Sequence, residues 1–104
     1  MKKVVENYRD ANYWYIKYDD GFIIQGGRIA QTFGTDSTWN FTFPKAFTAA
    51  PLSVIATFIA PRSGDSSGNE VGVKTNSVTA TGLTFINDGY GSNKTGYMWE
   101  ARGY

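Results

Sequence analysis

The side chains best suited to binding a ligand lie in two polar, glycine-rich segments, 62–70 (RSGDSSGNE) and 87–94 (NDGYGSNK). The second segment places one tyrosine ring among short amide, carboxylate and hydroxyl groups. Such a composition suits a sugar, because the ring stacks on apolar C–H faces while the short polar groups bind hydroxyls. An ordinary solvated surface loop explains the composition equally well. The candidate ligand-binding residues are Asp65, Asn69, Asp88, Tyr90 and Asn93.

The inventory of reactive side chains is narrow, since the chain contains neither cysteine nor histidine. Thiolate and imidazole zinc sites and Ser-His or Cys-His catalysis are therefore excluded. A carboxylate pair could still hydrolyse a glycosidic bond. Most of the nine acidic residues, however, fall in predicted turns, where a carboxylate rarely acquires the raised pKa that a general acid needs. The segment 65–70 also lacks the alternating oxygen ligands of a calcium loop. We expect no enzyme activity, no metal and no cofactor.

Aromatic residues make up 16% of the chain, with three Trp, seven Tyr and seven Phe. In the segment 12–21 (NYWYIKYDDG), period-two alternation places Trp14 and Tyr18 on one face of a strand, and Tyr13 and Tyr15 on the other. Because both faces are aromatic, one of them must be covered by a second sheet, an identical subunit or a ligand. Tyr13 and Tyr15 are therefore the candidates for a subunit interface.

The elements that must position these groups are predicted to be strands, since period two recurs along the chain and a helical period does not. Predicted strands include 38–43, which Pro44 ends, and 71–75, 77–80, 82–88 and 97–104. The most continuously apolar run, 52–61, is expected to be the most buried strand. The sequence predicts one all-β antiparallel domain of roughly eight to ten short strands, a sandwich or an open barrel.

The segment 19–27 (DDGFIIQGG) supplies a turn and a glycine pair. Asp20-Gly21 is a typical hairpin turn, because glycine accepts the positive φ that a tight turn requires. The pair Gly26-Gly27 lacks the spacing of a phosphate-binding loop. Glycines inside a strand pattern indicate a bulge or a close backbone approach. We interpret the pair as a kink that separates a strand over 22–25 from a strand over 28–33.

The totals limit the possible partners. A length of 104 residues fits one domain, and a net charge of +1 gives no bulk attraction to nucleic acid. The first ten residues, MKKVVENYRD, lack the apolar segment of a signal peptide, and no run is long enough to insert into a membrane.

The chain resembles the C-terminal domain of phage and prophage tail-fibre proteins in four segments: 14–27 (WYIKYDDGFIIQGG), 43–47 (FPKAF), 51–58 (PLSVIATF) and 97–104 (YMWEARGY). The resemblance covers nearly the whole chain from Asn12 onward. It implies a β-sandwich at the tip of a fibre in the virion, assembled as a homotrimer, that recognises a bacterial surface polysaccharide or protein. Residues 1–11 would then be a lead-in from a shaft, and 12–104 the tip domain.

Two other functions stay open at this stage. The domain could be a structural trimerisation or capping module of the fibre that makes no receptor contact. A glycan hydrolase is the third possibility, and it requires the carboxylate pair considered above.

Overall fold

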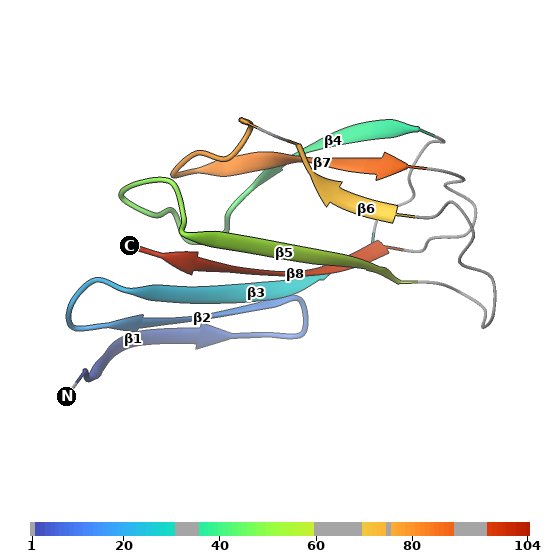
Figure 1. Ribbon diagram of the computed structural model, residues 1–104. Helices are drawn as coiled ribbons and strands as arrows, with labels where there is room; N and C mark the ends of the chain where they lie inside the picture. Colours follow the sequence, from blue (N-terminus) through green and yellow to red (C-terminus); the bar gives the residue numbers. More distant parts are fainter. Residues whose placement is uncertain (1, 31–35, 60–69, 75, 89–95) are drawn as a thin grey trace.

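The computed structural model describes residues 2–30, 36–59, 70–74, 76–88 and 96–104. These ranges form eight β-strands and no helix (Figure 1). None of them contains a helix long and apolar enough to cross a membrane. The strands are β1 (Val4–Arg9), β2 (Tyr13–Tyr18), β3 (Ile23–Ile29), β4 (Ser37–Thr42), β5 (Ser53–Ile59), β6 (Glu70–Val73), β7 (Gly82–Asp88) and β8 (Gly96–Gly103).

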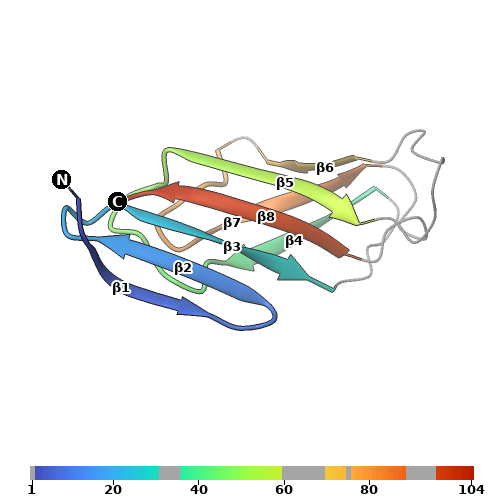
Figure 2. The same cartoon turned by 90° about the horizontal axis from the view of Figure 1, so that it is seen from below.

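The strands form two antiparallel sheets packed face to face. The larger sheet has the order β1-β2-β3-β8-β5, and the smaller sheet has the order β4-β7-β6. The smaller sheet lies over the β3, β8 and β5 side of the larger one, while the β1–β2 hairpin extends to one side (Figures 1 and 2). The predicted β-sandwich is therefore confirmed.

The chain reverses direction at every connection, so the molecule has two distinct ends. Both termini lie at one end (Figure 1). Strands β1, β3, β5 and β7 finish at the opposite end, and β2, β4, β6 and β8 begin there. We call this second end the distal end. A chain segment that leads into the N-terminus therefore meets the domain at the end opposite the distal end.

The core between the sheets is built largely from aromatic rings. Tyr97, Trp99 and Ala101 of β8 all point inward and are at most 5% exposed. Phe85 of β7 is fully buried, and its ring lies 4.5 Å from the ring of Tyr97. Among the described residues, the other buried apolar side chains are Ile23, Phe43, Phe47 and Leu83. Aromatic burial on this scale supplies much of the stabilisation of a small domain.

Two strand predictions are wrong. β5 is an edge strand of its sheet, and Ile55 on its outer face is 67% exposed, so the apolar run 52–61 is not the most buried. Residues 77–80 do not form a strand. The hydroxyl of Ser77 donates to the carbonyl of Lys74 at 2.7 Å and accepts the Thr84 N–H at 3.1 Å. These side-chain bonds compete with strand pairing.

The interpretation of Gly26-Gly27 as a kink is also wrong. β3 runs through both glycines, and each keeps its partners on β2 and β8. The glycines are required by close approach instead. A Cβ on Gly26 would lie 2.7 Å from the carbonyl oxygen of Trp99 and 2.9 Å from the ring of Trp14. A Cβ on Gly27 would lie 2.5 Å from the carbonyl oxygen of Asn12.

The hairpin turn at Asp20-Gly21 is confirmed. Gly21 has a φ of 91°, a left-handed conformation that favours glycine. The carboxylate of Asp20 accepts the Phe22 N–H at 3.0 Å and fixes the turn. One strand was not expected from the sequence: β1 lies within the segment 1–11, where it pairs with β2.

Candidate functional site

The distal end carries the strand ends that anchor both predicted ligand-binding segments. Residues 60–69 connect Ile59 of the larger sheet to Glu70 of the smaller sheet, and residues 89–95 connect Asp88 of the smaller sheet to Gly96 of the larger. Ile59 is paired with Gly96, and Glu70 is paired with Asp88. The two connections therefore start and finish at directly opposed residues, which brings their bases side by side.

The individual ligand-binding predictions stay untested. Asp65, Asn69, Tyr90 and Asn93 lie outside the described residues. Asp88 is the last residue of β7, and its backbone takes part in the pairing with Glu70. The sequence placed these residues in two loops without showing that the loops share one end of the domain. That information comes from the strand register.

The second candidate site is a group of three tyrosines on the β1–β2 hairpin, which we call the tyrosine cluster: Tyr8, Tyr13 and Tyr15. Tyr8 is opposite Tyr15 in the β1–β2 ladder, and Tyr15 is opposite Gln25 of β3. Directly opposed residues project from the same face of a sheet. The cluster therefore lies on the face that carries the core, in the part of it that extends beyond the smaller sheet.

The three rings are packed together and nearly parallel. The ring centroids of Tyr8 and Tyr13 are 5.0 Å apart, and both lie within 6.4 Å of the centroid of Tyr15. A column of three rings would separate the outer two by about twice the stacking distance of roughly 5 Å. The rings thus form a triangle rather than a column. Tyr8 is 44% exposed, and Tyr13 and Tyr15 are half-buried, so the patch is accessible in the monomer.

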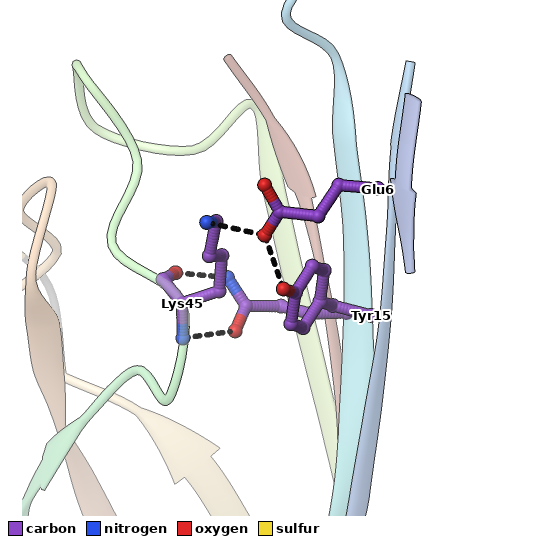
Figure 3. Close-up of polar contacts among 4 residues, drawn as sticks. Glu6, Tyr15 and Lys45 are labelled. Carbon is purple, nitrogen blue, oxygen red and sulfur yellow. Dashed lines mark hydrogen bonds and ion pairs between the residues drawn. The ribbon is translucent and has the colours of Figure 1, made fainter. Parts of the chain in front are cut away.

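Charged groups fix the orientation of Tyr15 (Figure 3). The Tyr15 hydroxyl donates to Oε2 of Glu6, and the same oxygen accepts Nζ of Lys45 at 2.8 Å. The Lys45 ammonium also lies 5.1 Å from the centre of the Tyr15 ring, a distance at which a cation is attracted to an aromatic face. The hydrogen bond to Glu6 raises the pKa of Tyr15 to about 12. The hydrogen bond from Lys45, followed by the one from Tyr15, lowers the pKa of Glu6.

Tyr8 is held in a similar way by Asp10. The Tyr8 hydroxyl donates to Oδ2 of Asp10 at 2.8 Å, and this bond raises the pKa of the phenol. Oδ1 of Asp10 accepts the backbone N–H groups of Tyr13 and Asn12 at 2.9 and 2.7 Å. These bonds close the β1–β2 turn and, with the Tyr13 N–H as the largest cause, lower the pKa of Asp10.

Gln25 of β3 joins the larger sheet to the connection between β4 and β5. Its side chain is fully buried. Its Nε2 donates to the carbonyl of Lys45 at 2.5 Å, and its Oε1 accepts the Lys45 N–H at 3.1 Å (Figure 3). These two hydrogen bonds to the backbone of Lys45 hold the residue where its ammonium can reach Glu6. The sequence contained a signal for it, because a polar residue at an inward position of a strand requires a buried partner.

Three carboxyls of the described chain are stabilised in their charged form. The carboxyls of Glu6, Asp10 and Asp20 all have a lowered pKa, whereas a general acid at neutral pH needs a raised one. The described residues also include no group of three acidic, histidine or cysteine side chains that could hold a metal ion. The site is suited to binding through rings and fixed hydrogen bonds.

Comparison with known proteins identifies the family of the chain. The family described as "Putative tail fiber protein gp53-like, C-terminal" matches residues 17–104. The chain belongs to this family. The resemblance to tail-fibre C-terminal domains is therefore confirmed. A comparison with curated proteins finds no match.

Solved structures of similar fold are pyocin tail fibres. The C-terminal part of the R2 pyocin fibre of P. aeruginosa matches with a TM-score of 0.72 and 23% identity, over 97% of this chain and 26% of that one. An N-truncated R1-type pyocin tail fibre matches with a TM-score of 0.70 and 26% identity, over 95% of this chain and 84% of that one. The tail-fibre domain described here spans about a quarter of the R2 fibre segment.

Proposed function

We propose that this tail-fibre domain is a receptor-binding tip that recognises a glycan or protein on a bacterial surface. The observation that carries the proposal is the position of the distal end. The strand ends that anchor segments 62–70 and 87–94 meet there, opposite both termini. In a fibre whose preceding chain enters at the N-terminus, these segments face the cell. Loops on a rigid scaffold are where recognition normally resides.

The working form of the domain in this proposal is a homotrimer within the virion, and no catalytic step is involved. Three copies of a weak site on one fibre raise the overall avidity without any new contact. The tyrosine cluster supports assembly, because a partly exposed aromatic patch at the sheet's free side is the type of surface that a neighbouring copy covers.

Adsorption to host cells tests the proposal. Segments 62–70 and 87–94 can be replaced separately by glycine-serine sequences of equal length, and binding of the labelled domain to a panel of bacterial strains can be measured. We expect a strain that binds the native domain to lose binding to at least one replaced form, while the unfolding temperature is unchanged. Undiminished binding of both replaced forms would contradict a receptor site at the distal end.

A structural capping module is the second candidate function. Its support is the tyrosine cluster, in which Glu6, Asp10 and Lys45 hold the rings in one arrangement, as a rigid assembly surface requires. If capping is the only role, Tyr8→Ser with Tyr13→Ser should lower the molar mass in light scattering, and the segment replacements should leave adsorption intact. A release assay for oligosaccharide from host polysaccharide separates both functions from a hydrolase.

A further inference from the structure

A shallow groove lies on the outer face of the larger sheet, next to the β1–β2 turn. Its volume is about 340 Å³, and its lining includes Asn12, Trp14, Arg28, Met98 and Glu100. Grooves of roughly this volume hold small organic ligands. The groove opens near the distal end, because Asn12 and Arg28 are joined there by a backbone bond of 2.8 Å.

The floor of the groove is the indole ring of Trp14. A Cβ on Gly26 would lie 2.9 Å from Cζ2 and 3.2 Å from Cε2 of this ring, so the ring lies across the glycine backbone instead of standing away from the sheet. One ring face therefore covers β3. Trp14 is only half-buried and lines the groove, so part of the residue is accessible from solvent. Gly26 is thus the residue that makes a flat aromatic surface possible here.

Polar groups surround this ring. In the sheet register, Gly26 is opposite Glu100, and Arg28 is opposite Met98. Within the described part of the chain, the guanidinium of Arg28, the side-chain amide of Asn12 and the indole N–H of Trp14 have no hydrogen bond or ion pair. Glu100 uses Oε1 to accept Arg102 at 2.7 and 2.9 Å, and Oε2 has no contact among these residues.

The tyrosine cluster differs in this respect. The hydroxyls of Tyr8 and Tyr15 are already bound to Asp10 and Glu6, and the ammonium of Lys45 is bound to Glu6. A polar ligand would have to break those bonds before it gained any of its own. At the groove it meets donors and an acceptor that are not bonded to other groups of the described chain, so no protein hydrogen bond has to be broken on binding.

We propose that the groove binds one pyranose ring of a bacterial surface glycan. The C–H face of the sugar carries partial positive charge and stacks on the negative face of the Trp14 ring. Arg28 and Asn12 donate to hydroxyl oxygens, and Glu100 accepts a hydroxyl hydrogen. The inference rests on the proposed receptor-binding function and adds to it a contact on the side of the domain, outside the distal loops.

The groove also continues toward β5. A second hollow of about 250 Å³ shares Met98 and Glu100 with the first and extends to Ile55 and Thr57. The combined surface follows one line across β3, β8 and β5. An oligosaccharide whose terminal ring lies on Trp14 can therefore extend along this surface across β8 toward Ile55.

Nuclear magnetic resonance of the nitrogen-15-labelled domain tests the inference. The probes are the methyl pyranosides of glucose, galactose, mannose, rhamnose, N-acetylglucosamine and N-acetylgalactosamine, raised into the tens of millimolar because one sugar ring binds weakly. We expect the Trp14 indole signal and the Arg28 and Met98 amide signals to shift saturably with at least one probe. The indole signal of Trp39, which packs against the core and does not line the groove, should not shift.

Substitutions give the second measurement. Trp14→Ala and Arg28→Ala should each weaken binding about tenfold, the effect of losing an interaction of about 1.4 kcal/mol. Trp14→Phe keeps a flat ring and should bind better than Trp14→Ala. Leu52→Ala is the matched control, because Leu52 is 73% exposed and directly precedes the start of β5, at the end of the strand opposite the distal end. It should bind the sugar as the native chain does. Circular dichroism confirms that each variant is folded.

Three results would overturn the inference. The groove is not the binding site if no pyranoside shifts the Trp14 signal. If the domain still binds whole cells in that case, the receptor-binding function stands and only the groove is excluded; if it does not, both proposals are contradicted. The groove is also excluded if a pyranoside binds but Trp14→Ala and Arg28→Ala retain its affinity. If the Trp14 signal moves with protein concentration alone while the molar mass rises, a second copy of the chain occupies the groove.

Discussion

Replacing Gln25 by glutamate tests the buried link between β3 and Lys45. The substitution Gln25→Glu keeps the shape of the side chain. A protonated carboxyl can donate to the Lys45 carbonyl and accept the Lys45 N–H, as the amide does. An ionised carboxyl keeps the second bond but turns an acceptor toward the carbonyl. The Lys45 ammonium is bound by Glu6 at 2.8 Å, so it does not neutralise the introduced charge.

The magnitude follows from burial. Position 25 is 0% exposed, and carboxyls buried to this degree have their pKa raised by up to about 3 to 5 units. Since the Lys45 N–H still stabilises the charged form, we expect the pKa of the introduced carboxyl to rise by about 2 to 3 units. At about 1.4 kcal/mol per unit, the charged form lowers the free energy of unfolding by about 3 to 4 kcal/mol. A raised folded-state pKa leaves stability intact below the unfolded value of about 4.3 and removes it as the pH rises through the folded value.

The assay is urea unfolding followed by tryptophan fluorescence, with the native chain measured at every pH and subtracted. We expect Gln25→Glu to cost less than about 1 kcal/mol near pH 4 and about 3 to 4 kcal/mol near neutral pH. The control is Gln25→Leu, which removes both hydrogen bonds without adding a charge and should cost about 2 to 3 kcal/mol at every pH. If the difference in unfolding free energy between Gln25→Glu and the native chain does not change with pH, the buried pair of hydrogen bonds between Gln25 and Lys45 is refuted.

Three further predictions concern the glycines and the hairpin. Gly26→Ala should destabilise the fold by about 1 to 3 kcal/mol in thermal unfolding, because the added methyl meets the Trp99 carbonyl, whereas Gly72→Ala, with nothing within 4 Å, should change little; equal effects would contradict the close approach. In an alkaline titration of phenol absorbance, one tyrosine should titrate near 12, and Glu6→Gln should return it toward 10; an unchanged titration would exclude the Tyr15–Glu6 bond. Since the folded pKa of Glu6 and of Asp10 is lowered, their stabilisation should be present above the unfolded values of about 4 and be lost as the pH falls through the folded values. Acid unfolding of Asp10→Asn, which keeps the shape without the charge, should show a weaker pH dependence than the native chain, and an identical dependence would contradict it.

Alternation along the chain was sufficient to predict that Tyr13 and Tyr15 share one face of β2, opposite Trp14. It depends on which side chains neighbour one another within a strand, and local sequence contains that information. β5 shows the limit. Its apolar run is compatible with burial on both faces, but a strand acquires a covered outer face only if another element packs there, and the exposed Ile55 shows that none of the described elements does.

The parts of the site that sequence did not reveal all depend on pairing between distant strands. The contact of Trp14 with Gly26 requires the register of β2 against β3, and the contact of Gln25 with Lys45 requires the path of a connection twenty residues away. A glycine pair in a strand indicates that another group approaches the backbone closely, but the sequence does not identify that group. The kink was therefore a reasonable local interpretation, and only the ladder to β2 and β8 could correct it.

The shared position of the two termini has a practical consequence. The carbonyl oxygen of Tyr104 accepts the Thr48 N–H at 2.8 Å and the Thr48 hydroxyl at 3.0 Å, so the last residue is fixed at the end of the domain that also carries the N-terminus (Figure 1). A fluorescent protein or affinity peptide appended to either terminus would emerge at the same pole. Both attachments leave the distal end unobstructed. The segments at that end could therefore be replaced by other sequences while the rest of the domain and its attachment stay the same.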